Sequence, residues 1–179
     1  MIRWDRFNIY LLGALAAAVT ATCGCRSPEE RQQRKLLSTL RLHVEASRDG
    51  TQANEAVPVY RAKPAWIRIT KTPVLTEANV SEAAVVDAVG GFALRIQFDH
   101  EGTVLLNQCT AMNRGRKIAI FSQFGNELKD SRWLAAPVIS RHITDGVLVF
   151  TPDATRAEAA EIALGLNNVV RKVRTWVDR

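Results

Sequence analysis

A cysteine in the middle of the chain, Cys109, could supply a nucleophilic thiolate if a neighbouring base lowered its pKa. The surrounding sequence offers no such base, because Leu105, Leu106 and Met112 accompany it in a helical pattern. A cysteine in this company is typically a small, buried apolar residue. We therefore expect Cys109 to be buried and unreactive.

The histidines could serve as general bases or as metal ligands. His43, His100 and His142 are far apart in the sequence and lie in dissimilar contexts. We expect His43 to be solvated, because it lies on the polar face of an alternating stretch. The sequence also contains neither G-x-S-x-G nor H-E-x-x-H. It therefore predicts no catalytic residue, no metal and no cofactor.

Asp99-His100-Glu101 could be mistaken for a metal site. Successive side chains on an extended segment point in opposite directions, so three in a row rarely converge on one ion. Acidic residues are also favourable at the positive end of a helix. We predict that Asp99 or Glu101 opens a helix from about Gly102 to Asn113. The expected apolar side of this helix carries Val104, Leu105, Cys109 and Met112.

The first 25 residues have the features of a targeting segment. Arg3 and Arg6 make a positive start, an eleven-residue apolar run covers residues 9–19, and Thr22-Cys23-Gly24-Cys25 follows. The run is shorter than the ~20 residues that span a bilayer. The segment resembles a bacterial lipoprotein signal peptide. This implies cleavage after residue 24 and acylation of Cys25 with fatty acids such as palmitate.

Cys23 is a poorer acylation site than Cys25, because Thr22 is bulkier than Gly24 at the cleavage position. The alternative is an uncleaved anchor helix in which both cysteines are incidental. With residues 1–24 removed and Cys25 acylated, Cys109 has no partner for an internal disulfide. Residues 25–37 are interpreted as a polar tether or as the first turns of a helix, and residues 38–179 as a single domain.

The charge pattern argues against a nucleic-acid partner. The chain carries a formal net charge of +6, from 24 basic and 18 acidic residues, and its arginines are scattered. Proteins that bind nucleic acid more often concentrate such residues in one patch. A mild positive balance is compatible with a position close to anionic lipid.

The main structural signal lies between Ile143 and Val173. A β-rich run over residues 147–150 follows the turn signal Asp145-Gly146. Thr155-Arg156-Ala157-Glu158 then has the pattern of a capping box. The helix that follows has one apolar face, which needs a sheet to cover. Its members are Ala159, Ile162, Ala163, Leu166, Val169, Val170 and Val173. We expect Ile162 and Leu166 to pack on the strands around residues 118–120 and 147–149.

Alternating or nearly continuous apolar runs predict the strands. A hairpin around Gly90-Gly91 is preferred to a short helix beginning near Asn79. Trp133 lies in a polar context, where it either covers the sheet edge or serves as an exposed contact anchor. The expected strands cover residues 40–46, 57–60, 66–70, 83–87, 93–98, 117–122 and 128–134.

Residues 73–170 also carry an ordered set of short motifs. They are Pro73-Val74-Leu75-Thr76, Val80, Ala83, Ile96-Gln97-Phe98, Glu101-Gly102, Thr110, Asn113, Lys117-Ile118-Ala119-Ile120, Ala136-Pro137-Val138-Ile139, Ile143, Gly146, Phe150-Thr151, Glu158-Ala159 and Leu164. This order resembles the head of the first periplasmic domain of SecD, the accessory subunit of the bacterial protein-export translocase. The resemblance implies an α+β, ferredoxin-like head, in which an antiparallel or mixed sheet carries two main helices on one face.

The resemblance also bears on function. The SecD head is proposed to engage emerging polypeptide and has no catalytic residues, so none is carried over to this chain. SecD has several membrane-spanning helices, whereas no run of spanning length follows residue 25 here. We therefore expect a non-catalytic binding module that is lipid-anchored in the cell envelope and faces the periplasm or the exterior.

The expected partners are the membrane, through the lipid, and unfolded polypeptide or protein-export components, bound by strand addition. A purely structural envelope lipoprotein is the alternative. An envelope hydrolase is disfavoured, because its motifs are missing.

Overall fold

The computed structural model describes residues 32–46 and 54–177. The chain separates by its internal contacts into residues 1–32 and residues 33–179, and the following account concerns the second unit. The predicted signal segment 1–24, Cys25 and the first part of the tether lie outside the described residues. The acylation site and the domain boundaries therefore stay predictions.

One sheet has four antiparallel strands in the order β4-β1-β7-β8. Its central strands β1 and β7 pair directly, with Leu42 opposite Ile120. These two strands form as predicted: β1 alternates and buries Leu42 and Val44, and β7 begins with a nearly continuous apolar run. The four strands are β1 (Arg41–Val44), β4 (Leu75–Thr76), β7 (Ile118–Phe124) and β8 (Asp130–Ala135).

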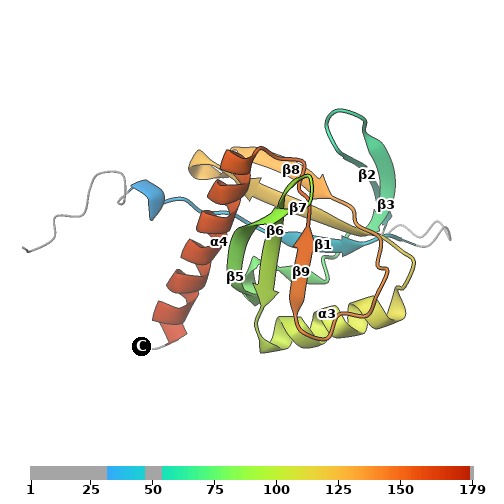
Figure 1. Ribbon diagram of the computed structural model, residues 1–179. Coiled ribbons are helices and arrows are strands. Elements are labelled where there is room, and N and C mark those ends of the chain that lie inside the picture. Colours follow the sequence, from blue (N-terminus) through green and yellow to red (C-terminus); the bar gives the residue numbers. More distant parts are fainter. Residues whose placement is uncertain (1–31, 47–53, 178–179) are drawn as a thin grey trace, which may run out of the picture. The chain divides into compact units, whose positions relative to one another are not determined.

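A second antiparallel sheet has the order β5-β6-β9 (Figure 1). The turn between its first two strands uses Gly90 and Gly91 at φ of +83° and +157°, a conformation that residues with a Cβ rarely adopt. The hairpin predicted around these glycines is therefore confirmed. The strands are β5 (Val80–Ala88), β6 (Gly91–Phe98) and β9 (Val147–Phe150).

The remaining two strands, β2 (Asn54–Val59) and β3 (Ala65–Thr70), form a hairpin of their own. Its β3 strand also touches β1, since the Ala46 amide donates to the Arg68 carbonyl at 2.8 Å. The α+β class with antiparallel sheets and two main helices is thus confirmed, although the strands are divided among three sheets.

Among the described residues, the two main helices are α3 (His100–Met112) and α4 (Arg156–Val177), and short 3-10 turns cover Glu77–Asn79 (η1) and Asn126–Leu128 (η2). The capping box of α4 is confirmed. The Glu158 amide donates to Thr155 Oγ1 at 3.2 Å, and the Thr155 amide donates to Glu158 Oε2 at 2.7 Å. In the described part of the chain, no helix combines the length and apolar character needed to cross a bilayer.

The main core lies between the β4-β1-β7-β8 sheet, the β5-β6-β9 sheet and the buried sides of both helices. Ile162 and Leu166 are fully buried in it, as expected. However, α4 packs mainly on β5 rather than on residues 147–149 (Figure 1). Gly165 lets α4 approach the segment that precedes β1, since a Cβ at position 165 would collide with Ser38.

A second, smaller core lies on the opposite face of the four-stranded sheet, under the β2–β3 hairpin. Trp133 packs against this core and against Phe121, with ring centroids 5.0 Å apart. Trp133 therefore covers the sheet, which is one of the two roles considered for it. The buried members of this core are Val57, Val59, Ile67, Ile69, Ala119 and Ala136.

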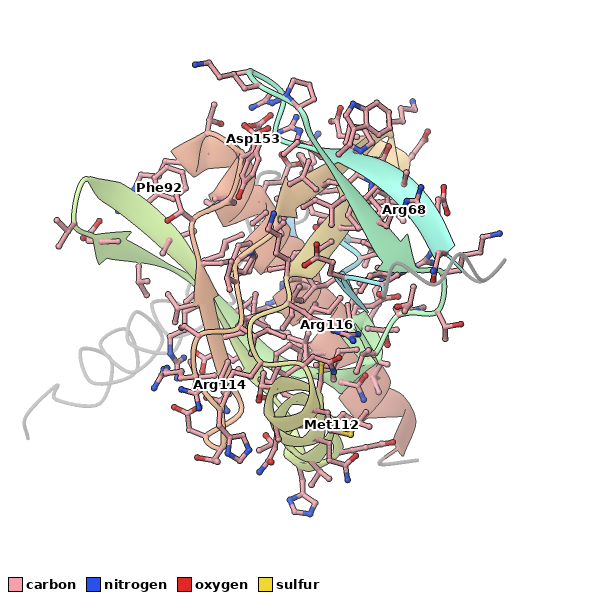
Figure 2. The ribbon with its side chains drawn as sticks, turned by 90° about the vertical axis from the view of Figure 1, so that its right-hand side faces the viewer. Arg68, Phe92, Met112, Arg114, Arg116 and Asp153 are labelled. Carbon is pink, nitrogen blue, oxygen red and sulfur yellow. The ribbon has the colours of Figure 1, made fainter. Side chains whose placement is uncertain are left out.

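The predicted apolar side of α3 is partly wrong. Val104 and Met112 are 43 % and 78 % exposed, and Figure 2 shows Met112 at the surface end of the helix. Cys109 is buried as predicted, whereas Leu106 and Thr110 are buried in place of Val104 and Met112. A threonine can be buried in this stripe because its hydroxyl donates to the Leu106 carbonyl at 2.8 Å.

Candidate functional site

Three of the residues considered for catalysis, Cys109, His43 and His142, have structural contacts, and His100 is exposed. Cys109 is 6 % exposed in the core side of α3, and burial raises the pKa of its thiol. A raised pKa keeps the thiol protonated at neutral pH, so Cys109 is a poor nucleophile. Its burial was predicted and is confirmed.

His43 is not solvated, contrary to the prediction. It is 7 % exposed, with Nδ1 2.8 Å from the Thr70 carbonyl. Its ring meets Trp133 edge-on at 5.5 Å. The alternation in β1 was read correctly, but the face that it assigned to solvent is covered by the β2–β3 hairpin.

The other two histidines lie on α3 or next to it. His100 is exposed in the first turn of α3, while Asp99 caps that helix by accepting a 2.7 Å bond from the Gly102 amide. His142 lies 2.7 Å from Asn107 Oδ1. Among the described residues, no group of three or more His, Cys, Asp or Glu side chains is placed to hold a metal ion.

The candidate site is the outer edge of β9. The Phe98 amide of β6 donates to the Gly146 carbonyl at 2.9 Å, which fixes the alternation of the β6–β9 ladder. In an antiparallel pair, every second residue turns its amide and carbonyl away from its partner strand. Those residues of β9 are Val147 and Val149.

The outward groups of Val149 are the free ones. Asp145 Oδ1 accepts the Val147 amide at 3.1 Å. In the described part of the chain, by contrast, no hydrogen bond reaches the amide or carbonyl of Val149 from outside the sheet, and its side chain is 53 % exposed. An unpaired strand edge of this kind is a template for a further strand.

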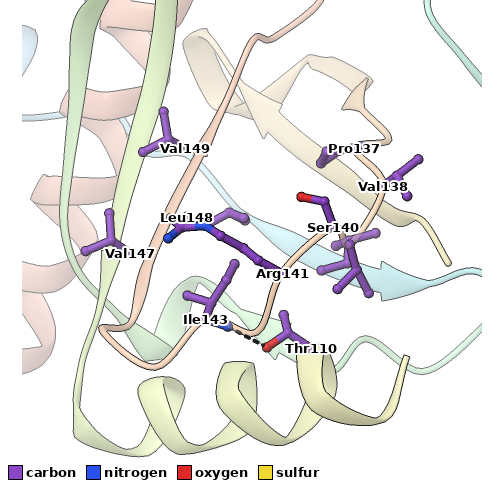
Figure 3. Close-up of a pocket in the computed structure, with 11 residues that line it drawn as sticks. Thr110, Pro137, Val138, Ser140, Arg141, Ile143, Val147, Leu148 and Val149 are labelled. Carbon is purple, nitrogen blue, oxygen red and sulfur yellow. Dashed lines mark hydrogen bonds between the residues drawn. The ribbon is translucent and has the colours of Figure 1, made fainter. Parts of the chain in front are cut away.

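A hollow of about 140 Å³ lies beside this edge (Figure 3). Ile118, Ile139 and Leu148 are apolar and nearly buried within its lining. An apolar cavity of about 150 Å³ can hold a benzene-sized group. Arg141 extends across the hollow from the opposite wall (Figure 3), and its side chain makes no ion pair with the described residues.

The wall facing β9 is held in place from two sides. Residues 137–139 pair with the start of β7, where the Ile118 amide donates to the Pro137 carbonyl at 3.0 Å. The next residues are fastened to α3, since the Ile143 amide donates to Thr110 Oγ1 at 3.1 Å. The wall opposite β9 is therefore held in place by both β7 and α3.

Other sheet edges are protected. At the β5 edge, Asn167 of α4 accepts from the Ala83 amide at 2.9 Å and donates to the Ala83 carbonyl at 2.8 Å. The β2 edge carries Pro58, which has no amide to offer. On β8, the Leu134 carbonyl accepts from the Asp153 amide at 2.7 Å. The edge of β9 differs from all three.

Sequence reasoning predicted β9 as a strand but missed its open edge and the role of Asn167. The role of Asn167 did have a signal in the sequence. Asparagine is unfavourable inside helices, yet Asn167 and Asn168 interrupt the apolar face of α4. The openness of β9 had no such local signal, since it depends on how residues 137–143, α3 and β7 are placed around the strand.

The chain matches a protein family over residues 54–169, and the description of that family is SecDF, P1 head subdomain. The match covers more than half of the chain, so the chain belongs to this family. No curated protein matches the chain.

Two solved structures share the fold at 21 % sequence identity. One is described as the structure and function of a membrane component SecDF that enhances protein export. It has a TM-score of 0.54, and the similarity covers 82 % of this chain and 70 % of that chain. The other, SecDF in a super-membrane-facing form, has a TM-score of 0.53 and covers 80 % of this chain and 21 % of that chain.

Proposed function

We propose that this protein is a non-catalytic module of protein export that binds extended polypeptide along β9, outside the cytoplasm and anchored by a lipid on Cys25. The observation that carries the proposal is the amide and carbonyl of Val149, which no described residue outside the sheet binds, beside a hollow with apolar and polar walls. Membership in the SecDF P1 head family supports a role in export, since a solved relative is described as enhancing it.

The geometry suits strand addition. Backbone hydrogen bonds to Val149 would hold a polypeptide regardless of its sequence, so binding should be broad and weak. A side chain of the bound strand would enter the hollow against Ile139 and Leu148. Arg141 at the hollow favours acidic over basic residues at that position.

Two substitutions at one position test this mode of binding. In Val149→Pro the outward amide is lost, and the sheet can tolerate the proline because that amide does not pair with β6. Val149→Thr keeps the amide and the β-branched shape. We expect Val149→Pro to weaken association with a panel of unfolded polypeptides by about fivefold or more, whereas Val149→Thr should bind normally.

Equal binding by the two variants would contradict the β9 edge as the site. No association with any unfolded chain, combined with stable capture of one folded envelope protein, would favour a purely structural lipoprotein. Turnover of a substrate that is lost on replacing Cys109 or a histidine would exclude a non-catalytic role.

The anchor is tested separately. Mass spectrometry of membrane-extracted protein should find an acylated N-terminal peptide beginning at Cys25. Cys25→Ala should release the protein from membranes or block its processing, and Cys23→Ala should leave both unchanged. An unmodified Cys25 in a chain that retains Met1 would remove this part of the proposal.

A further inference from the structure

The β2–β3 hairpin presents a surface that the binding of polypeptide at β9 does not use. Four basic residues and no acidic ones lie between Glu55 and Glu77 in the sequence. Figure 1 shows the loop of this hairpin projecting from the rest of the domain.

Trp66 and Arg68 lie on one face of the hairpin, because Ile67 and Ile69 between and beyond them turn into the smaller core. Trp66 is 71 % exposed. On β2, Pro58 lies opposite Trp66 and Ala56 lies opposite Arg68. Pro58 and Ala56 are both exposed. The outer face is therefore an exposed apolar strip centred on an indole ring, with a cation beside it.

The positive charge on this face is not neutralised internally. Arg61 pairs with Asp153 at 3.4 Å, which leaves Lys63 in the loop, Arg68 on β3 and Lys71 just after it. None of these three side chains has an ion pair or a hydrogen bond within the described residues, and all three are exposed. Figure 2 shows Arg68 on the outer side of the hairpin.

The nearest acidic residue on β2 points elsewhere. Glu55 lies opposite Ile69 in the ladder, so its side chain belongs to the other face of the hairpin from Trp66 and Arg68. We call Lys63, Trp66, Arg68 and Lys71 the basic hairpin face. It combines Trp66 and Arg68 on one side of the ladder with Lys63 in the loop and Lys71 just after β3, and its three cations make no ion pair with the described residues.

We propose that the basic hairpin face docks on the headgroups of an anionic lipid bilayer. Tryptophan is enriched at the boundary between headgroups and acyl chains, where its ring is apolar and its N–H stays hydrated. Each lysine or arginine close to such a surface adds attraction. A planar bilayer needs no groove, and the hollow described above lies at β9. The proposal does not depend on polypeptide binding.

Lipid contact can be read locally at Trp66 in the full chain. The chain is reconstituted into vesicles of phosphatidylcholine, with or without phosphatidylglycerol, that contain lipids brominated near the headgroup. The sequence has four tryptophans, and subtracting the signal of Trp66→Phe isolates the contribution of Trp66. We expect bromine to quench Trp66 in the anionic vesicles and to have little effect in the zwitterionic ones. High salt should abolish the quenching, since screening shortens the reach of charge to about 3 Å at 1 M.

A matched pair of triple variants separates the hairpin from net charge. One carries Lys63→Gln, Arg68→Gln and Lys71→Gln. The other carries Arg114→Gln, Arg116→Gln and Arg171→Gln, which are exposed residues elsewhere in the described chain and remove the same charge. Figure 2 shows Arg114 and Arg116 away from Arg68. The hairpin triple should lower the lipid-bound fraction of Trp66 by about tenfold or more, and the second triple should leave it nearly unchanged.

Equal quenching of Trp66 in zwitterionic and anionic vesicles would overturn the proposal. So would an equal loss in the two triple variants. Shielding of Trp66 that appears only when a folded envelope protein is added, with vesicles alone having no effect, would assign the face to a protein partner instead. The salt dependence of the unaltered chain decides the question even if a variant folds poorly.

Discussion

The two edge strands of the β5-β6-β9 sheet, β5 and β9, differ in whether their outward backbone groups are covered. Along β5, helix α4 lies against the strand, and the amide of Asn167 pairs with both backbone groups of Ala83 as another strand would. Along β9, no described residue pairs with the corresponding groups of Val149, and a hollow lies there instead of a helix. Helix α4 thus closes the β5 edge, whereas the β9 edge is open among the described residues and available to a strand from another molecule.

The difference follows from the path of the chain after β9. Residues 151–155 lead directly into α4, and α4 then packs on β5 at the far side of the sheet. A single helix cannot cover both edges of a sheet that contains three strands. The exposure of β9 is therefore a consequence of topology, whereas closure of β5 required a specific polar side chain in an apolar helix face.

The largest expected effect comes from loosening α4. Leu166 is fully buried, so Leu166→Ala should lower the free energy of unfolding by about 2–5 kcal/mol. The exposed Val173 on the same helix is the control, and Val173→Ala should change stability by about 0.5 kcal/mol or less. Chemical denaturation measures both. An unchanged unfolding midpoint for Leu166→Ala would mean that α4 does not hold the β5 side.

Removing the side-chain closure of β5 should have the next largest effect. Asn167→Ala leaves the Ala83 amide and carbonyl without partners, which should cost about 1–3 kcal/mol. Hydrogen exchange at the Ala83 amide should accelerate with it. Asn107→Ala is the control. It removes the exposed contact between Asn107 and His142, and it should leave hydrogen exchange at the Ala83 amide unchanged. Unchanged protection of Ala83 in Asn167→Ala would show that this bond does not close the edge.

Acid should weaken the closed side next. Arg132 Nη2 lies 3.0 Å from Glu158 Oε1, and this bond, together with the Thr155 amide, lowers the pKa of Glu158 from 4.5 to about 2. The resulting stability is complete above the ordinary pKa and is lost as the pH falls toward the lowered one. Glu158→Gln should therefore cost about 1 kcal/mol at neutral pH.

The pH profile gives the check on Glu158. The difference in unfolding free energy between the unaltered chain and Glu158→Gln should shrink between about pH 5 and pH 2. A constant difference across that range would mean that the carboxylate and Arg132 are not coupled.

The smallest expected effect is at the open edge itself. Val149→Thr should change the free energy of unfolding by less than about 0.5 kcal/mol, since the side chain is half exposed and β-branched in both cases. The Val149 amide should exchange rapidly in the free protein and slow down when an unfolded polypeptide is added. Slow exchange without any ligand would show that the edge of β9 is already covered.

Much of this architecture could be predicted from local patterns. The Gly90-Gly91 turn, the Asp99 cap and the Thr155–Glu158 capping box are each written in a few adjacent residues, and the structure has all three. The strands β1, β3, β6 and β7 follow from apolar alternation or from continuous apolar runs, whose period is also local.

What could not be predicted depends on segments that meet only in the fold. His43 is buried because a hairpin more than ten residues later in the chain covers its face. Met112 is exposed because α3 turns Leu106 and Thr110 inward, and hydrophobicity alone does not reveal which face of a short helix will be covered. The candidate site combines residues 137–149 with Thr110 of α3 and Ile118 of β7, and no motif in the sequence marks it.

The entry of the chain into the domain has a mechanical consequence. Asn168 of α4 donates to the carbonyls of Gln33 at 2.8 Å and Leu36 at 3.0 Å, and Gly165 packs closely on Ser38. A pulling force applied ahead of residue 33 would therefore reach α4 before it reaches β1. Beyond that clamp, β1 lies between β4 and β7, so the load would act along its length and strain the hydrogen bonds of both ladders together. The domain is built to resist traction from its N-terminal side.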